Sequence, residues 1–84
     1  MVTKYQIVPK GASLENPDSY KCVININQRC NIFVAYDKDA AMLEKYAGEL
    51  TERRGNRVSF DEKMFSEILC RMSIMKIVVN ICVK

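Results

Sequence analysis

The C-terminal stretch SFDEKMFSEILCRMSIMKIVVNICVK, residues 59–84, decides the fold of this chain. Its first four residues have the spacing of a capping box, in which a serine hydroxyl and a glutamate carboxylate cap the first turn of a helix. Apolar residues then recur at helical spacing over 64–72 and at strict period two over 75–83. The stretch therefore predicts a helix, opened by Ser59, that leads into a long strand with one apolar face.

Upstream, residues 20–26 and 30–36 alternate as the two strands of a β-hairpin with a three-residue loop. The most consistent register puts four pairs on one buried face: Ile26 opposite Cys30, Ile24 opposite Ile32, Cys22 opposite Val34, and Tyr20 opposite Tyr36. The other face then carries Lys21, Val23 and Asn25 against Asn31, Phe33 and Ala35. In this register Val23 and Phe33 form a cross-strand pair on the open side of the sheet.

The remaining segments complete a single small domain over residues 1–84. Residues 3–8 alternate as a first strand, and a helix opened by Asp37 or Asp39 runs to about Arg54. The order β-β-β-α-α-β predicts an α+β fold, with a mainly antiparallel four-stranded sheet and two antiparallel helices packed on one face. The last strand should run antiparallel to the third strand, beside it or beside the first.

Composition narrows the chemistry that the chain can perform. The sequence has no histidine, which removes the commonest general base near neutral pH and the commonest metal ligand. The three glycines are scattered, so there is no glycine-rich phosphate loop. Adjacent acidic residues begin the predicted helices, where capping accounts for them. We therefore expect a protein that is not an enzyme and that binds no cofactor and no metal.

The cysteines and the hydropathy pattern indicate a cellular compartment. Cys22, Cys30, Cys70 and Cys82 lie in or beside apolar runs, so we expect reduced cysteines in the core, with disulfides or a metal site as alternatives. The sequence shows no signal peptide, and no apolar run approaches the roughly 20 residues that span a bilayer. We expect a cytoplasmic protein that does not contact a membrane.

Two surfaces are candidate sites. The first is the sheet face away from the helices, where apolar residues rimmed by lysine and asparagine are typical of a binding surface. Its candidate partner-binding residues are Lys21, Val23, Phe33, Lys76, Val78 and Asn80. The second surface is a basic cluster at the end of the first predicted helix, formed by Arg53, Arg54 and Arg57.

These features predict a small non-enzymatic module that binds another protein through its open sheet face or an edge strand. Regulators, inhibitors (viral and phage antagonists of host machinery among them) and assembly subunits belong to this class, and a homodimer is one form of it. The alternative is a single-stranded nucleic-acid-binding protein, with a base stacked on Phe33 and phosphates held by surrounding lysines and arginines. The net charge of +3 is too small to decide between them.

Overall fold

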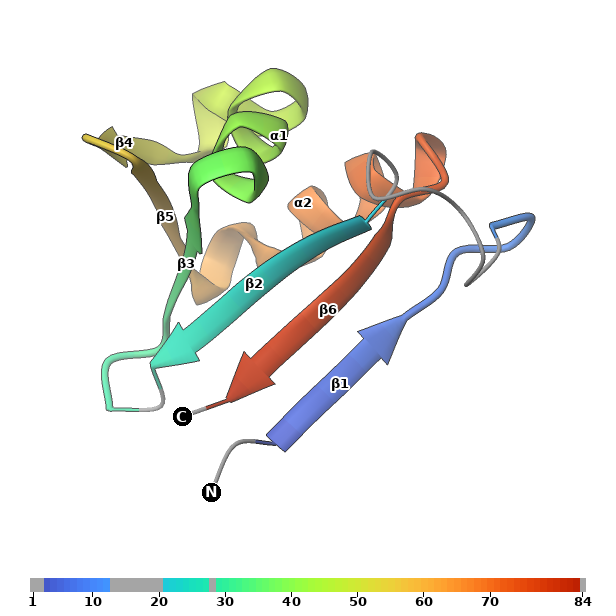
Figure 1. Cartoon of the computed structure of the whole chain (residues 1–84), viewed down its shortest axis with the longest axis horizontal. Coiled ribbons are helices and arrows are strands. Elements are labelled where there is room, and N and C mark those ends of the chain that lie inside the picture. The colour runs from blue at the N-terminus through green and yellow to red at the C-terminus, as the bar shows by residue number, and fades with distance from the viewer. Residues whose placement is uncertain (1–2, 13–20, 28, 84) are drawn as a thin grey trace.

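The computed structural model describes residues 3–12, 21–27 and 29–83 of the chain. Their strands and helices are, in order, β1 Thr3–Ile7, β2 Lys21–Asn27, β3 Ile32–Tyr36, α1 Asp37–Ala47, the 3-10 helix Gly48–Leu50, β4 Glu52–Arg54, β5 Arg57–Asp61, α2 Glu62–Ile74 and β6 Val78–Val83 (Figure 1). The predicted α+β class, with one sheet and two helices, is confirmed. Tyr20, which the predicted hairpin included, lies outside the described residues.

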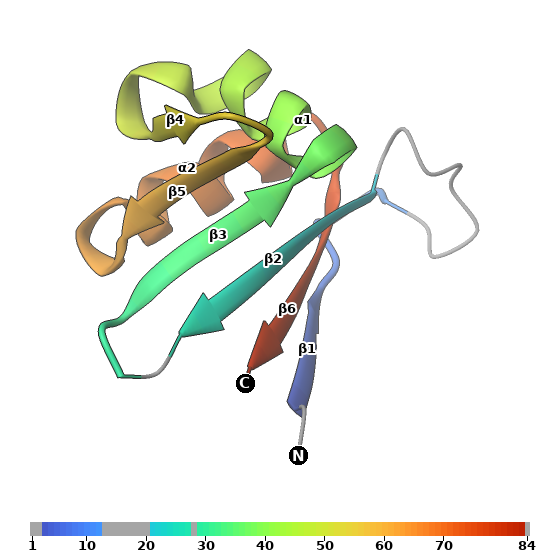
Figure 2. The same ribbon diagram turned by 60° about the vertical axis from the view of Figure 1, so that its left-hand side comes forward.

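The sheet is larger than the sequence predicted, and it is mixed. Six strands take the order β1-β6-β2-β3-β5-β4, which Figure 2 shows with the helices behind them. β6 lies between β1 and β2, antiparallel to the first and parallel to the second. The last strand therefore lies beside the first strand, which is one of the two positions predicted for it. The predicted count of four strands is wrong. The sheet is mainly antiparallel as predicted, since β2–β6 is the one parallel pair among its five strand pairs in the described part of the chain.

The two additional strands come from a segment that the sequence assigned to helix and linker. α1 ends at Ala47 instead of about Arg54, and the 3-10 helix leads into the β4–β5 hairpin. Gly55 forms the turn of this hairpin with φ 63°, a left-handed conformation that glycine adopts without steric penalty. Val58 and Phe60 are buried between exposed or half-buried neighbours, which is the alternation of a strand with one buried face.

This hairpin also changes how α2 begins. Ser59 lies inside β5, so the predicted capping box does not form. Asp61 is the N-cap instead, and its carboxylate accepts a hydrogen bond of 3.0 Å from the Lys63 backbone N–H. One acidic residue thus satisfies a free donor of the first turn, as capping side chains do.

The register of β2 and β3 differs from the predicted one by three residues. Ile26 lies opposite Phe33 instead of Cys30, and Asn25 lies opposite Val34. Because side chains alternate between the faces of a strand, an odd shift turns β3 over. Phe33 and Ala35 therefore face the helices, whereas Ile32, Val34 and Tyr36 face away from them.

Aromatic stacking explains why β3 takes this register. The ring of Phe33 stacks on Phe60 of β5 at 5.0 Å between centroids and on Phe65 of α2 at 4.5 Å. Such pairs stabilise a protein by about 0.5–1.5 kcal/mol each beyond the area that they bury. In the predicted register Phe33 would lie on the other face and lose both contacts.

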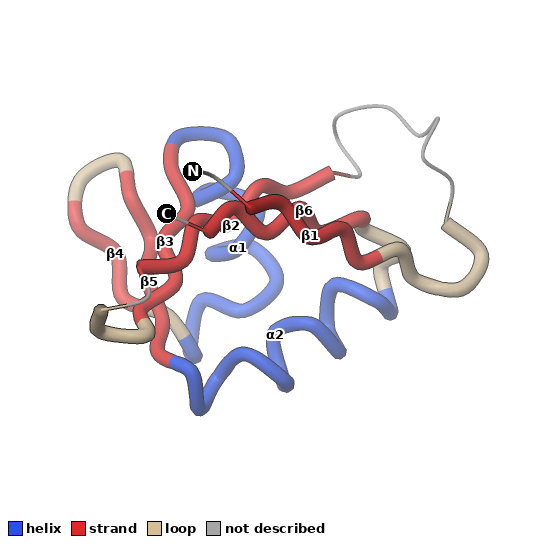
Figure 3. Tube along the Cα trace, turned by 90° about the horizontal axis from the view of Figure 1, so that it is seen from below, coloured by secondary structure: helices blue, strands red, loops and turns tan. Residues whose placement is uncertain are grey.

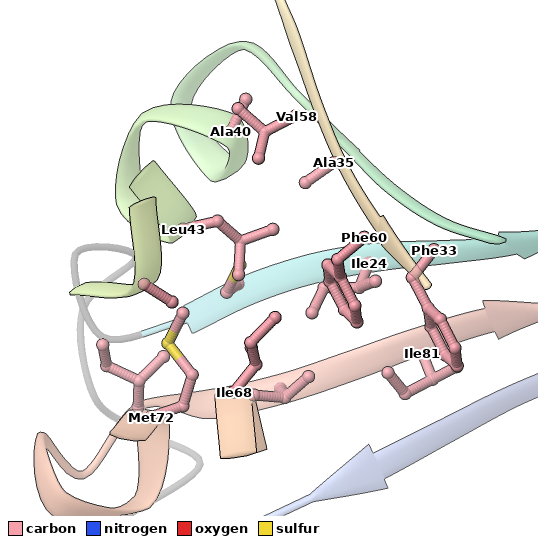
Figure 4. Packing of buried hydrophobic residues seen from close by; sticks show 14 residues of the cluster. Ile24, Phe33, Ala35, Ala40, Leu43, Val58, Phe60, Ile68, Met72 and Ile81 are labelled. Atoms are coloured by element: carbon pink, nitrogen blue, oxygen red, sulfur yellow. The ribbon is translucent and has the colours of Figure 1, made fainter. Parts of the chain in front are cut away.

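One hydrophobic core joins the sheet to both helices. Each helix buries its apolar stripe in this core, α1 through Ala40, Leu43 and Ala47 and α2 through Ile68 and Met72 (Figure 4). The helices cover the same face of the sheet, with α2 passing along β2 and β6 in Figure 3. The opposite face, called the outer face below, is covered by neither α1 nor α2.

Candidate binding surface

The outer face is defined by strand register. Side chains that share it form rows across the sheet; one such row consists of Cys82, Asn25, Val34, Ser59 and Glu52. In the neighbouring row Tyr36 of β3 lies opposite Arg57 of β5, which in turn lies opposite Arg54 of β4. The outer face therefore gathers residues from segments that are far apart in the sequence.

Two adjacent hollows follow β3 on the outer face, and together we call them the outer groove. The larger has a volume of about 510 Å³ and is lined by Asn25, Ile26, Asn27, Arg29, Val34, Tyr36 and Arg57. The smaller, of about 330 Å³, is lined by Asn27, Cys30, Ile32, Val34, Glu52, Arg54, Arg57 and Ser59. They share Asn27, Val34 and Arg57, so they form a continuous depression.

The floor of the outer groove is apolar and exposed to solvent. Tyr36 exposes 42% of its surface and Ile32 exposes 38%, with the half-buried Val34 between them. Asn25 of β2 crosses to this strand, where its Nδ2 donates a hydrogen bond of 3.4 Å to the Val34 carbonyl. Three consecutive outward residues of one strand therefore present apolar surface where a solvated sheet face is normally polar.

The rim of the outer groove is mainly cationic. Arg54 forms an ion pair with Glu52 at 3.1 Å, within the same short strand. Arg29 and Arg57 form no ion pair with any carboxylate in the described part of the chain. The lining thus combines three arginines with one glutamate, so an acidic group approaching the groove meets a favourable field.

Two of the predicted partner-binding residues are not on the open surface. Phe33 is 4% exposed and belongs to the core, because the register shift turned it toward the helices. Val78 is completely buried at the start of β6, a central strand flanked by both β1 and β2. The predicted placement of Phe33 on the open face is wrong. Val78 has the outer-face register that was predicted, opposite Lys21, but its side chain is not accessible.

The other four predicted residues are at least partly accessible, and three of them lie close together on the outer face: Val23 of β2 is opposite Asn80 of β6, and Lys21 is two residues before Val23. Lys76 lies in the turn before β6, with φ 59°, and its side chain approaches Gly11 instead of the outer groove. Lys21 and Val23 lie half-buried on β2, outside the lining of the groove. Asn80 of β6 accepts a hydrogen bond of 3.0 Å from the Gln6 side chain of β1, so its polar group has a structural partner.

The predicted basic cluster divides between the two faces of the sheet. Arg53 lies opposite the buried Val58, on the helix side, and forms an ion pair of 2.9 Å with Glu44 of α1. Arg54 and Arg57 lie on the outer face and line the outer groove. The cluster sits on a hairpin and not at a helix end, so its residues alternate in direction.

Sequence reasoning missed the apolar floor of the groove and one arginine of its rim: Arg29, Ile32, Val34 and Tyr36. β3 reads Ile-Phe-Val-Ala-Tyr, which is apolar at every position. Alternation cannot choose a face in such a run, so the only available signal was the pairing with neighbouring strands. That pairing was the part of the prediction that failed.

The cysteines give no sign of a site that uses their sulfur atoms. All four are free, and Cys22 is buried in the core, as expected. Burial raises the pKa of the Cys22 thiol to about 12. Cys30 and Cys70 are exposed, contrary to the expectation of core positions, and Cys82 is half-buried. The described residues contain no group of three or more acidic or cysteine side chains that could hold a metal ion.

Comparisons of the chain with protein-family models, with curated proteins and with solved structures found no match. Within the described residues, neither helix is long and apolar enough to cross a membrane.

Proposed function

We propose that the chain is a small binding module that recognises another protein through the outer groove. This proposal rests on the exposed apolar floor of the groove, which is formed by Ile32, Val34 and Tyr36. A sheet face in contact with water normally carries polar side chains, so these apolar residues are unusual there. An apolar centre with a polar and charged rim is the usual anatomy of a protein interface. Tyrosine and arginine are also the residue types that contribute most to binding at such centres.

The charges of the rim indicate the chemistry of the partner. Arg29 and Arg57 reach solvent without a carboxylate partner among the described residues, and Arg54 is offset by Glu52. A partner segment with aspartate or glutamate beside an apolar residue would satisfy both parts of the groove. Arginine favours such contacts because its planar guanidinium can donate two parallel hydrogen bonds to one carboxylate. We propose that the chain, by binding such a partner, acts as a regulator, an inhibitor or an assembly subunit.

Single-stranded nucleic acid is the second candidate, and one observation favours it. The only tyrosine lining the described groove, Tyr36, lies opposite Arg57, so a base could stack on the ring while its phosphate meets the guanidinium. The aromatic residue in this proposal is Tyr36, because Phe33 is buried. The single ring of Tyr36 can stack on one base, whereas the apolar floor of the groove extends along β3. The geometry therefore supports a protein partner better.

The test is capture from native cell extract with three matched versions of the full chain. We expect specific proteins to bind the wild type and to be lost with the double variant Tyr36→Ala, Arg57→Glu. They should be retained with Lys45→Glu, which changes charge on the exposed side of α1. Equal capture by all three chains would contradict the proposal.

A parallel titration with a fluorescent oligothymidine at low salt tests the second candidate. Binding that weakens steeply with salt and disappears with Tyr36→Ala would assign the groove to nucleic acid.

A further inference from the structure

The two free edges of the sheet differ in how they are protected. β4 has three residues, Glu52, Arg53 and Arg54, and all of them are charged and exposed. Short, charged edge strands resist pairing with another chain. β1 is longer, and all five of its residues, Thr3–Ile7, pair with β6 on one side only (Figure 1). Its other side meets no strand in the described part of the chain, and it holds a single charged residue, Lys4.

An apolar groove opens beside this unprotected edge, on the helix-covered face. It has a volume of about 370 Å³, and seven apolar or aromatic side chains line it: Tyr5, Ile7, Ile26, Phe33, Phe65, Ile81 and Val83. No charged residue contributes to the lining. Tyr5 is 58% exposed at its mouth, although its pairing with Ile81 directs it to the face that holds the core. α2 therefore leaves apolar surface uncovered next to β1.

The occupant that fits this edge is a second copy of the chain. A two-fold interface must be complementary to itself, and an unpaired strand meets this condition by pairing antiparallel with its own copy. Centred on Tyr5, this pairing sets Tyr5 opposite the partner copy's tyrosine, Lys4 opposite glutamine and Thr3 opposite isoleucine. No like charges face each other across it. The outer face, with its three arginines, lacks this self-complementarity.

We propose that the chain forms a homodimer by antiparallel pairing of β1 with β1 of a second copy. Each Tyr5 would then lie at the mouth of the apolar groove shared by the two copies, and exposed apolar surface on both would leave water. The two-fold axis of such a pairing stands perpendicular to the sheet. Both outer grooves would consequently face the same side of one continuous sheet. This dimer does not depend on what the outer groove binds.

Sedimentation equilibrium of the full chain, from micromolar to millimolar concentration, tests the dimer. The wild-type mass should rise from 9.7 kDa toward twice that value as concentration increases. Tyr5→Lys and Tyr5→Glu should each weaken association by roughly tenfold or more, because each places like charges opposite one another. Both variants should remain folded, since Tyr5 is largely exposed.

An equimolar mixture of the two variants gives the sharpest result. Opposite charges then face each other across the two-fold axis, so the dimer should return in the mixture alone. Tyr36→Lys, at an exposed tyrosine of the outer face, is the matched control and should associate as the wild type does. A chain that stays monomeric at millimolar concentration overturns the proposal. So does association that survives Tyr5→Lys and is lost with Tyr36→Lys, which would assign the interface to the outer face.

Discussion

Replacement of Phe33 by alanine should remove a large part of the stability of this protein. Phe33 is 4% exposed and stacks on both Phe60 and Phe65, so the truncation leaves a cavity between β5 and α2. Phenylalanine-to-alanine changes in cores cost about 3–5 kcal/mol. A chain of this length has a total unfolding free energy of about 4–12 kcal/mol, at about 0.05–0.15 kcal/mol per residue. Phe33→Ala therefore removes a quarter or more of it.

Urea denaturation followed by circular dichroism measures this loss. With a slope of about 1 kcal/mol per molar urea, the midpoint should fall by about 3–5 M, and the slope should not change. Phe33→Leu leaves a smaller cavity but loses both stacked contacts, which together contribute about 1–3 kcal/mol. Its loss should still be smaller than that of Phe33→Ala, which keeps the comparison measurable if the alanine variant does not fold.

Tyr36→Ala is the control, because Tyr36 lies three residues further along the same strand and faces the other way. We expect it to change the unfolding free energy by less than about 1 kcal/mol, as exposed positions usually do. The predicted register, with Phe33 outward and Tyr36 buried, reverses this order. Equal losses for the two alanine variants, or a larger loss for Tyr36→Ala, would refute the assignment of faces to β3.

Three further predictions concern a helix cap, a thiol and an ion pair. Asp61→Ala should lower the unfolding free energy by about 1 kcal/mol, and Ser59→Ala by clearly less, in paired thermal melts. Iodoacetamide at pH 8 should label the two exposed cysteines of the native chain and reach Cys22 only on unfolding, as mass spectrometry of digests will show. The Arg71 guanidinium holds the pKa of the Glu49 carboxyl below its usual range. Stability from this pair is present above the unfolded-state pKa and disappears as the pH falls through the folded one, so Glu49→Gln should differ from wild type at pH 7 and match it in acid.

Local patterns in the sequence predicted the elements that carry a clear period. The buried face of β2, with Cys22 and Ile24, and the inward face of β6, with Val79 and Ile81, agree with the alternation read from the sequence. The apolar stripe of α2 agrees as well, since Ile68 and Met72 are buried. Each of these segments also carries polar residues on its other face, such as Lys21 and Asn25 in β2 and Asn80 in β6, so the period identifies one face.

The parts that failed depend on long-range pairing. The segment 52–61 contains good helix and turn residues, and its hairpin exists because β5 pairs with β3, more than twenty residues upstream. β3 is apolar throughout, so its outward face follows from that pairing and from the stacking of Phe33 on Phe60. The capping box at Ser59 matched in spacing alone, and the hydrogen bonds of β5 took precedence over it. Tertiary contacts commonly override local preferences in this way.

The outer groove and the β1 edge differ in charge, so each is suited to a different kind of partner. Arg29 and Arg57 make the outer groove repel a copy of itself and attract an acidic partner, whereas Tyr5 lies on an edge where the charge pattern permits self-pairing. Their combination has a consequence beyond either surface alone. A β1-paired dimer presents two outer grooves toward one side, so a partner with two matching segments gains from effective concentration without any new contact. A chain of 84 residues could in this way hold an assembly more tightly than one small groove allows.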